Sequence, residues 1–480
     1  MSKTAFVSTS IPYVNARPHI GFAFEIVQAD TIARYLRLTG HDTFFITGTD
    51  ENSLKNVRAA RDEGITTREL CDRNSTAFQG LLGPLNISAS DFIRTSSDVH
   101  VRGAQALWSR CRPEDIYRKH YTGLYCVGCE DFYTEKEAPN RICPSHGAAL
   151  EIVEEENYFF RLSAYQDRLL ELIESGRLRV VPVSRQNEML AFIRGGLQDF
   201  SISRSRERAG DWGIHVPGDG SQVIYVWYDA LANYVTSLDL RDGSERLNKY
   251  WLNCTRKIHV IGKDINRFHS IYWPAILLSA GLPTPETVFV HGFITINGQK
   301  ISKSLGNVID PLVQVERFGV DPVRYYLLRA ISPFEDGDFS EERFRDVYNA
   351  DLANNLGNLA RRIETIGEKA HYAPPVWTTV LDAPEGYHAA MAEYRLNDAL
   401  ATLWDIATEL NGRIEVAKPW ELQKAGKDAA LREFLDLAVS DLRCIAHWLS
   451  PFLPDTGDTL KEAFGNKELR RGDPLFPRLT

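Results

Sequence analysis

The stretch Pro18-His-Ile-Gly21 combines residue types that suit phosphate chemistry. It follows a strand-like run, Ala5–Thr9, and opens a pattern of apolar residues at helical spacing. The start of a helix offers backbone N–H groups and the positive end of the helix dipole to an anion. His19 adds a side-chain donor, and Gly21 lets a ligand approach the backbone. A strand followed by a helix is common, so this stretch alone is a weak indication of a phosphate site.

A second stretch, Gly298–Asn307, supplies cations for the same chemistry. Lys300 and Lys303 lie close together, with serines beside them and glycines on both sides. Such a segment fits a solvated surface loop, as most Lys/Ser/Gly segments do. It also fits a mobile cationic loop that closes over a triphosphate, and the presence of the first stretch favours this second interpretation.

The spacing of four residues indicates a metal site. Cys126 and Cys129 form a Cys-x2-Cys pair, and Cys143 and His146 form a Cys-x2-His pair further along the chain. Two short turns of this kind direct four ligands at one tetrahedral Zn²⁺ ion. A redox pair or unbound thiols would not require the matching second half. We therefore predict one structural zinc ion, closed by four protein ligands. The seven cysteines, an odd number, argue against a disulfide framework.

Two carboxylates come directly after strand-like runs. Asp50 follows Asp42–Thr47, and Asp264 follows Lys257–Ile261 and Gly262. Open α/β sheets bind ligands at the carboxyl ends of their strands, so Asp50 suits a substrate ammonium group and Asp264 suits ribose hydroxyls. The local pattern fits Asp50 equally well as a helix N-cap.

An apolar stripe runs through Trp227–Tyr234 at roughly helical spacing. Core packing is the commoner origin of such a stripe. Aromatic rings also suit a thioether, through favourable contact with sulfur. His269 lies in an aromatic helical segment, where a satisfied core histidine is the commoner case.

The composition limits the classes of protein. The chain has 480 residues, enough for about three domains, and its 44% hydrophobic and 25% charged residues are ordinary for a globular protein. The net charge of -9 excludes an overall basic field, so nucleic acid would need a local basic surface. The N-terminus has no signal-peptide pattern, and no apolar run approaches the ~20 residues of a membrane span. These features predict a cytoplasmic protein that spans no membrane.

Together the two phosphate stretches resemble the paired signature motifs of class I aminoacyl-tRNA synthetases. His19–Phe22 is similar to the HIGH motif, and Lys300–Ser304 is similar to the KMSKS motif. The flanking sequence resembles methionyl-tRNA synthetases over essentially the whole chain, in the short form without an appended C-terminal domain. The resemblance implies an α/β fold. A Rossmann-type parallel-sheet catalytic domain would be split by a connective insertion with a zinc knuckle and followed by a C-terminal α-helical anticodon-binding bundle.

The resemblance also implies the domain boundaries. The catalytic domain would comprise residues 1–113 and 223–310, the connective insertion 114–222, the linker that contacts the tRNA stem 311–348, and the anticodon-binding domain 349–480. From the sequence patterns we expect amphipathic helices over residues 55–113. We also expect a strand near Val223–Trp227 that returns the chain to the sheet.

Individual roles follow from the same resemblance. His19, Lys300 and Lys303 would act catalytically on the triphosphate. ATP would contact Tyr13, Asn15, His19, Gly21, Gly262, Asp264, Phe293, Ile294 and Lys303. Methionine would contact Ser10, Ile11, Asp50, Trp227, Ala230, Leu231, Tyr234 and His269. The CAU anticodon would be read by Asn358, Arg362 and Trp420, an amide, a guanidinium and a ring of the kinds that bind and stack on single-stranded bases.

The implied reaction has two steps. The carboxylate of methionine attacks the ATP α-phosphate and releases pyrophosphate, and the adenylate then passes methionine to the terminal ribose of tRNA. ATP with Mg²⁺, L-methionine and tRNA(Met), including the initiator, would be the partners of a monomer. The alternatives are a diverged class I synthetase for another amino acid and a non-catalytic tRNA-binding paralogue. A paralogue that only binds tRNA would have no use for the retained Asp50, Asp264 and two lysines.

The chain departs from the family pattern at three places. Phe22 replaces the second histidine of the HIGH motif, which removes one phosphate donor, and we expect another group to compensate. Ile301 replaces a methionine conservatively. Glu51-Asn52-Ser53 stands where the family has Glu-His-Gly, which would alter hydrogen bonding or loop geometry near Asp50.

Overall fold

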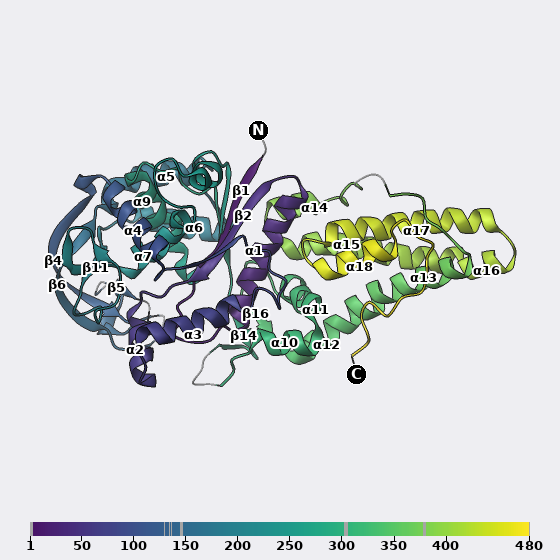
Figure 1. Ribbon diagram of the computed structural model, residues 1–480, viewed down its shortest axis with the longest axis horizontal. Helices are drawn as coiled ribbons and strands as arrows, with labels where there is room; N and C mark the ends of the chain where they lie inside the picture. Colours follow the sequence, from purple (N-terminus) through teal and green to yellow (C-terminus); the bar gives the residue numbers. More distant parts are fainter. Residues whose placement is uncertain are drawn as a thin grey trace. The chain divides into compact units, whose positions relative to one another are not determined.

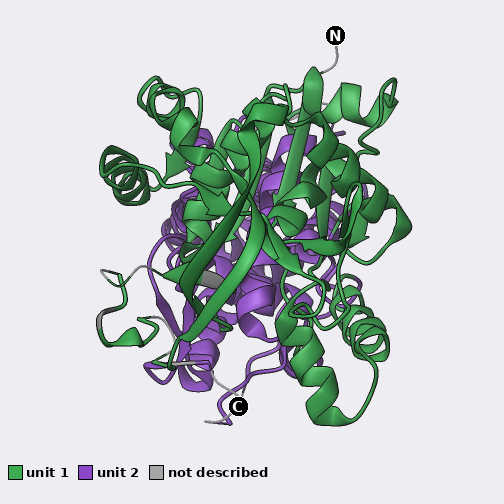
Figure 2. Ribbon diagram, turned by 90° about the vertical axis from the view of Figure 1, so that its left-hand side faces the viewer, with its two compact units in different colours: residues 1–18, 39–82, 88–291 green, residues 19–38, 83–87, 292–480 purple. Residues whose placement is uncertain are grey.

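The computed structural model describes residues 3–128, 130–133, 135, 137–144, 147–301, 306–377 and 381–479. The chain forms two compact units, which Figure 2 draws in green and purple. Unit 1 comprises residues 1–18, 39–82 and 88–291, and unit 2 comprises residues 19–38, 83–87 and 292–480.

Unit 1 is built on a six-stranded sheet in which all neighbouring strands are parallel. The strand order is β3-β2-β1-β12-β13-β7, and β1 and β2 are labelled in Figure 1. The chain runs outward from β1 to β2 and β3 on one side and from β12 to β13 on the other, so the order reverses between β1 and β12; β7, from earlier in the chain, forms the edge beyond β13. The bounds are β1 Thr4–Thr9, β2 Asp42–Thr49, β3 Asp91–Arg94, β7 Arg179–Val181, β12 Arg256–Gly262 and β13 Thr287–His291.

The central strands are buried along nearly their whole length, as expected for a parallel sheet covered on both faces. The strands expected at Ala5–Thr9, Asp42–Thr47 and Lys257–Ile261 are β1, β2 and β12. At the point of reversal, the Ser10 N–H after β1 donates to Val260 O on β12 at 3.0 Å. The carboxyl ends of β1 and β12 therefore meet at the place where open α/β sheets bind ligands. The parallel α/β prediction is confirmed.

The helices of unit 1 begin at well-formed caps. Ser53 caps α2, Thr66 and Glu69 form a capping box at α3, and Ser97 caps α4. Helices α7 and α9 are buried throughout or nearly so and share one apolar core with the sheet. The bounds are α2 Leu54–Glu63, α3 Thr67–Gln79, α4 Asp98–Arg110, α5 Gln166–Glu174, α6 Val183–Arg194, α7 Val226–Thr236, α8 Glu245–Leu247 and α9 Trp273–Ser279.

Two small antiparallel sheets come from the segment expected to be an insertion. Their orders are β5-β4-β6-β8 and β10-β11-β9. The same segment also contributes β7 to the parallel sheet. The bounds are β4 Ile116–Cys126, β5 Asp131–Tyr133, β6 Glu151–Phe160, β8 Phe200–Ser201, β9 Ser203–Ser205, β10 His215–Val216 and β11 Asp219–Ile224.

Two predictions of secondary structure are wrong. The apolar run at Val223–Trp227 does not return to the parallel sheet, because β11 pairs with β9 and β10 and helix α7 begins at Val226. A fully buried helix and a fully buried strand are both apolar on every side, so periodicity does not separate them. The helical expectation for residues 55–113 missed β3, an edge strand of four residues.

Unit 2 contains the helix that follows His19 and the C-terminal helices. Helices α15, α17 and α18 pack together, as expected for the C-terminal bundle (Figure 1). The bounds are α1 Ile20–Leu38, α10 Pro311–Phe318, α11 Val320–Tyr325, α12 Glu341–Val347, α13 Asn358–Lys369, α14 Tyr387–Ala392, α15 Leu396–Ala417, α16 Pro419–Lys424, α17 Asp428–Leu449 and α18 Pro454–Ala463, with strands β14 Ile294–Ile296, β15 Gln299–Lys300 and β16 Gly337–Phe339.

A buried ion pair anchors α1 within unit 2. Arg324 Nη2 lies 2.8 Å from Asp30 Oδ2, and both side chains are fully buried. Arg324 Nε also donates to Phe452 O at 2.7 Å. Because a buried guanidinium needs all its donors satisfied, this residue fixes α1 against the loop before α18.

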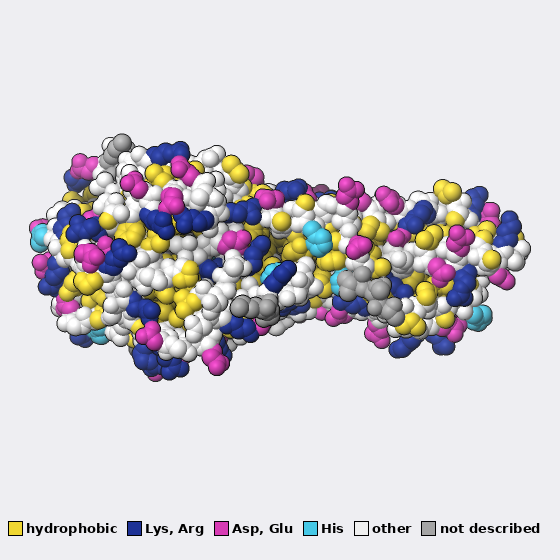
Figure 3. Space-filling model, turned by 90° about the horizontal axis from the view of Figure 1, so that it is seen from above, with side chains coloured by type: hydrophobic (Ala, Val, Ile, Leu, Met, Phe, Trp, Pro, Cys, Tyr) yellow, Lys and Arg dark blue, Asp and Glu magenta, His cyan; other side chains and the backbone are white. Residues whose placement is uncertain are grey.

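The surface has mixed charge on the face shown in Figure 3, where Lys and Arg side chains are scattered among Asp and Glu. None of the helices in the described part of the chain is long and apolar enough to cross a membrane.

Candidate active site

Tyr13 and Asp50 come together where β1 and β2 end. They form an isolated parallel bridge, and Asp50 N–H donates to Pro12 O at 2.9 Å. Helix α2 begins later, at the Ser53 cap, so the alternative reading of Asp50 as an N-cap is wrong. The Asp50 side chain is therefore available for another role.

The Asp50 carboxylate is buried and poorly supplied with donors. It is 2% exposed and accepts one hydrogen bond from the described residues, from Asn52 N–H at a long 3.3 Å. Burial, together with the neighbouring negative charge of Asp229, raises the pKa of Asp50 well above its usual range. A cationic group placed here would relieve both effects.

Aromatic rings lie next to this carboxylate. Trp227 stacks on Phe268 with ring centroids 3.8 Å apart, and Tyr13 meets Trp227 edge-on at 6.3 Å. The Tyr13 hydroxyl is buried and has no hydrogen-bond partner among the described residues. Lys55 Nζ lies 4.2 Å from the centre of the Tyr13 ring. The group forms an apolar wall with one unsatisfied hydroxyl.

Helix α7 carries the apolar stripe on to Tyr234. The Tyr234 hydroxyl lies 2.7 Å from His269 Nε2, and His269 Nδ1 lies 3.0 Å from Ile265 O. A carbonyl only accepts, so Nδ1 carries the proton and Tyr234 donates to Nε2. His269 is 3% exposed and both of its ring nitrogens are satisfied. Ala230 and Leu231, on the same helix, are buried as well.

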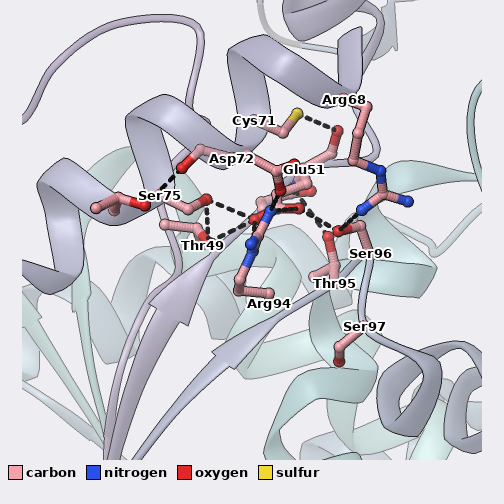
Figure 4. Close-up of polar contacts among 12 residues, drawn as sticks. Thr49, Glu51, Arg68, Cys71, Asp72, Ser75, Arg94, Thr95, Ser96 and Ser97 are labelled. Carbon is pink, nitrogen blue, oxygen red and sulfur yellow. Dashed lines mark hydrogen bonds and ion pairs between the residues drawn. The ribbon is translucent and has the colours of Figure 1, made fainter.

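The neighbouring Glu51 is held on all sides, as Figure 4 shows. Its carboxylate accepts from Arg94 Nε at 2.6 Å and from Ser75 Oγ at 2.5 Å, and also from Thr49 and Ser96. Its carbonyl accepts from the Trp212 indole at 2.7 Å. This network connects the end of β2 with α3 and β3 and fixes the loop that carries Asp50.

The second half of the expected site lies in unit 2, where His19 precedes α1. His19 Nδ1 accepts from Gly21 N–H at 3.1 Å, so the neutral ring carries its proton on Nε2. Burial lowers the pKa of His19, which favours this neutral form. A Cβ at position 21 would lie 2.9 Å from the His19 ring, so the ring needs a glycine there. The Nε2–H donor remains to meet a ligand.

The backbone at the start of α1 differs from the expectation. Ile20 N–H donates to Ile309 O at 3.0 Å, and Phe22 and Ala23 N–H donate to His19 O. The prediction of free amides aimed at phosphate is therefore wrong for these residues, because His19 and the segment after the lysine loop cap the helix themselves. The donor that this helix start presents is the His19 side chain.

The segment around the lysine loop is partly described. Lys300 ends β15, a Cβ at Gly21 would lie 3.9 Å from Ile301, and Lys303 lies outside the described residues. Phe293 N–H donates to Asp336 Oδ1 at 2.8 Å, and its carbonyl accepts from Gly337 N–H. Ile294 pairs with β16. The backbone atoms expected to meet adenine thus already form part of a small sheet.

The remaining residues expected to bind substrate lie at the ends of β1 and β12. Gly262 ends β12 and is buried, while Asp264 is exposed in the turn that follows. Ser10, Ile11 and Asn15 are partly exposed after β1. These positions follow the carboxyl ends of the two central strands between which the strand order reverses.

The described half of the expected zinc site fits a structural metal. Cys126 ends β4, and both Cys126 and Cys143 are buried in one small apolar cluster. The Cys143 carbonyl accepts from Gly147 N–H at 2.8 Å. Cys129 and His146 lie outside the described residues, and the described ones contain no group of three metal-ligating side chains.

The residues expected to read the anticodon lie on the helices of unit 2. Asn358 is exposed at the start of α13, and Arg362, one turn later, pairs with Glu415 at 2.6 Å. Trp420 on α16 is 38% exposed, which is unusual for a ring of its size.

Sequence reasoning missed Asp229 and His100. Asp229 lies within the Trp227–Tyr234 stripe, and its carboxylate is 2.5 Å from His100 Nε2. A buried acidic residue needs a partner. The presence of an aspartate inside an apolar helical segment was therefore the sequence signal that could have identified Asp229. Phe268, which stacks on Trp227, was also missed.

Three comparisons with known proteins agree with this geometry. A model of the family described as tRNA synthetases class I (M) matches residues 5–151 and 136–364. A methionine–tRNA ligase of Brucella suis biovar 1 (strain 1330) is 41% identical, over 98% of this chain and 97% of the relative. One of Thermotoga maritima is 43% identical, over 94% and 74%. A solved structure of Mycobacterium tuberculosis methionyl-tRNA synthetase in complex with methionyl-adenylate is 37% identical with a TM-score of 0.92, over 99% of this chain and 100% of that one.

The parallel sheet, with its ligand edge at the reversal between β1 and β12, and the histidine at the start of α1 are features of the class I aminoacyl-tRNA synthetases. The match extends over nearly the full length of the Brucella suis relative. Within this class, the chain belongs to the methionine–tRNA ligase family.

Proposed function

We propose that this protein charges tRNA(Met). It activates L-methionine with ATP to methionyl-adenylate and pyrophosphate and then transfers methionine to the 3′ end of the tRNA. The observation that carries the amino-acid half is Asp50, a buried carboxylate with a raised pKa and one long hydrogen bond from the described residues. A substrate ammonium group supplies the missing charge.

The apolar part of the substrate is the next element of the proposal. Trp227, Phe268 and Tyr13 are rings at the same strand edge, and sulfur makes favourable contact with aromatic rings. Tyr234 and His269 add a hydrogen-bonded pair further along the wall. Ser10, Ile11, Ala230 and Leu231 would complete the methionine site.

ATP would be held by residues from the strand ends and from the start of α1. Gly262 and Asp264 would meet the nucleoside with Phe293 and Ile294, while Tyr13, Asn15, Gly21 and His19 would meet the phosphates. Lys300 and Lys303 would neutralise charge that develops on the triphosphate, and Mg²⁺ would enter with ATP. No group on the protein is covalently modified, so catalysis consists of positioning and charge stabilisation.

Asn358, Arg362 and Trp420 would bind the CAU anticodon, which initiator and elongator tRNA(Met) share. Asn358 and Trp420 are exposed and Arg362 is partly exposed, which supports this assignment. Arg362 is held by Glu415 in the free protein, so the anticodon must exchange this ion pair for contacts to a base or phosphate.

A structural zinc ion would be bound by Cys126, Cys129, Cys143 and His146. Bound there, it would hold two turns together and would leave no open position for water. The buried thiols Cys71, Cys111 and Cys254 form no disulfide, which suits the reducing cytoplasm. We also expect a monomer, which sedimentation would test.

The activity is tested by amino-acid-dependent ATP–pyrophosphate exchange without tRNA, across all twenty amino acids. Exchange with methionine alone would support the proposal. Exchange with a different amino acid would contradict the pocket assignment, and no exchange would contradict activation itself. In the same assay Phe22→His should leave the rate unchanged, because the neutral His19 already presents a donor.

A further inference from the structure

Three polar side chains, of which His100 and Asp229 are fully buried and Asn52 is partly exposed, form a hydrogen-bonded row that ends at Asp50. His100 on α4 lies 2.5 Å, through Nε2, from Asp229 Oδ1 on α7. Asn52, in the loop after β2, donates from Nδ2 to Asp229 Oδ2 at 2.7 Å and to Thr95 O at 3.1 Å. The Asn52 backbone N–H then donates to Asp50 Oδ1. We call these three side chains the Asp229 row.

The row does not itself react. His100 Nδ1 also lies 2.8 Å from Thr236 Oγ1, so hydroxyl, imidazole and carboxylate follow one another as in a nucleophilic triad. The side chains of Thr236, His100 and Asp229 are all fully buried. The Thr236 hydroxyl also faces the carbonyl of Asn233 on its own helix. A substrate has no access to the hydroxyl. The row therefore acts by holding other groups in place.

The backbone is shaped to keep the row together. Helices α4 and α7 approach so closely at Gly103 that a Cβ there would lie 2.5 Å from Thr236 Cγ2. This close approach sets His100 against Asp229. Asp229 is paired with His100, yet taking both groups out of water costs several kcal/mol that the pairing only offsets. An apolar residue would fill the same space without that cost.

We propose that Asp229, held by His100 and Asn52, is a positioning residue for the α-ammonium group of the amino-acid substrate. Through Asn52 it orients Asp50, and its charge adds a second negative centre to the site where the ammonium binds. This inference rests on the proposed function, because it assumes that Asp50 meets an ammonium group. A substrate whose nitrogen is acylated, and so uncharged, would face two uncompensated carboxylates and be rejected.

The charges around Asp50 give this inference a measurable consequence. Asp229 on α7, Glu51 in the same loop and Glu130 beyond β4 all raise the pKa of Asp50, in addition to burial. Lys55 lies over the neighbouring Tyr13 ring and is a nearby cation. When an ammonium group binds, it lowers the pKa of Asp50 and so displaces any proton that the carboxylate holds. Removing the charge of Asp229 should reduce this proton release.

The test compares Asp229→Asn with the wild-type protein by titration calorimetry. L-methionine is titrated at several pH values in two buffers of different ionisation enthalpy, which counts the protons released. We expect about tenfold weaker affinity at pH 8, the equivalent of one pKa unit, and fewer protons released. In pyrophosphate exchange the KM for methionine should rise while kcat and the KM for ATP stay within about twofold. The acid limb of kcat/KM should move to lower pH.

Two further variants separate positioning from general damage. His100→Leu removes the donor to Asp229 and should weaken methionine binding, whereas His100→Gln keeps a donor at the position of Nε2 and should restore it. Ser75→Ala removes one hydrogen bond to Glu51 and should leave the methionine affinity unchanged. Ser75 lies on α3 and contacts the neighbouring carboxylate, so this variant serves as the matched control.

The inference is overturned if Asp229→Asn binds methionine with wild-type affinity and proton release. It is also overturned if all kinetic constants and the unfolding temperature fall together and the pH profile does not move, since that is the signature of a structural role. If the wild-type protein bound methionine but gave no pyrophosphate exchange, the proposed activity would be refuted. The calorimetric comparison of methionine binding by the wild-type protein and Asp229→Asn would still test the role of Asp229.

Discussion

Asp50 and Glu51 are adjacent in sequence and both are buried, yet the structure treats their carboxylates in opposite ways. Glu51 accepts from Arg94, Ser75, Thr49 and Ser96 (Figure 4). Asp50 accepts one long hydrogen bond from the described residues and lies close to another negative charge. The first arrangement stabilises the fold, and the second leaves a charge that is balanced when a cation binds.

The difference shows how one loop serves two purposes. Satisfying a buried carboxylate fully is the way to make it rigid, and Glu51 holds the end of β2 against α3 and β3. Because the loop is fixed at Glu51, Asp50 can remain poorly solvated without collapsing onto a partner of its own.

The largest expected effect is that of Asp50→Asn on activity. The variant keeps the shape of the side chain and removes its charge, so the ammonium group loses its partner. Truncating one member of a buried charge pair costs about 2–5 kcal/mol, so kcat/KM for methionine should fall about 30- to 5,000-fold. Exchange kinetics over a range of methionine concentrations measure this. A fall of less than tenfold would show that Asp50 is not the ammonium partner.

The same variant should make the free protein more stable at neutral pH. In the wild-type protein, the pKa of Asp50 is higher in the native state than in the unfolded state. At pH values between these two pKa values the native state binds more protons than the unfolded state, so the free energy of unfolding falls as the pH rises. Asp50→Asn removes that loss. The unfolding temperature should rise by a few degrees at pH 8, and the gain should vanish below about pH 4, where the carboxylate is protonated in both states.

Glu51→Gln should have the opposite effect to Asp50→Asn: it should lower the stability of the fold and leave methionine binding intact. It leaves Arg94 with only the partly exposed Asp72 as an acidic partner among the described residues. The cost should be about 2 kcal/mol of folding free energy, less than for a fully buried pair because 30% of the Arg94 side chain is exposed. Chemical denaturation measures the loss, and Asp72→Asn, with a change within about 0.5 kcal/mol, is the control. A stable Glu51→Gln protein that had lost methionine binding would contradict the division of roles.

The contrast between the two carboxylates was only half visible in the sequence. An acidic residue after an apolar strand marks the ligand edge of a parallel sheet, and this predicted Asp50. Ser75 on α3 and Arg94 on β3, which hold the Glu51 carboxylate, lie 24 and 43 residues further along the chain, and no local pattern joins them to it. The N-cap reading of Asp50 failed because Ser53, three residues later, takes that position.

The fold was predictable where single segments decide their own structure. The strands β1, β2 and β12 each contain a short apolar stretch, such as Phe44–Ile46 in β2. Strand β3 is short and lies at the edge of the sheet, and α7 is buried on every side, so neither has a periodic pattern. His100 and Asp229 were not predictable as a pair, because their contact depends on the close approach of two helices at Gly103.

Tyr13→Phe tests the unsatisfied hydroxyl beside Asp50. The hydroxyl has no partner among the described residues, so its removal should leave stability unchanged or raise it by about 1 kcal/mol. If the hydroxyl bonds to substrate, kcat/KM should fall about tenfold, as expected for one hydrogen bond. Measuring KM for methionine and ATP separately would identify the substrate that it meets. Wild-type kinetics would show that it meets neither.

The smallest expected effect is at Ser53, the other end of the same loop. Its hydroxyl accepts from Asn56 N–H at 3.3 Å and caps α2, so Ser53→Ala should cost about 1 kcal/mol of stability. Ser53→Gly should cost only a few tenths of a kcal/mol, because glycine is tolerated at N-caps. Neither variant should change the KM for methionine if Glu51 alone fixes the loop. A rise in KM for alanine but not glycine would show that the cap, too, positions Asp50, and the roles of the two ends would then be coupled.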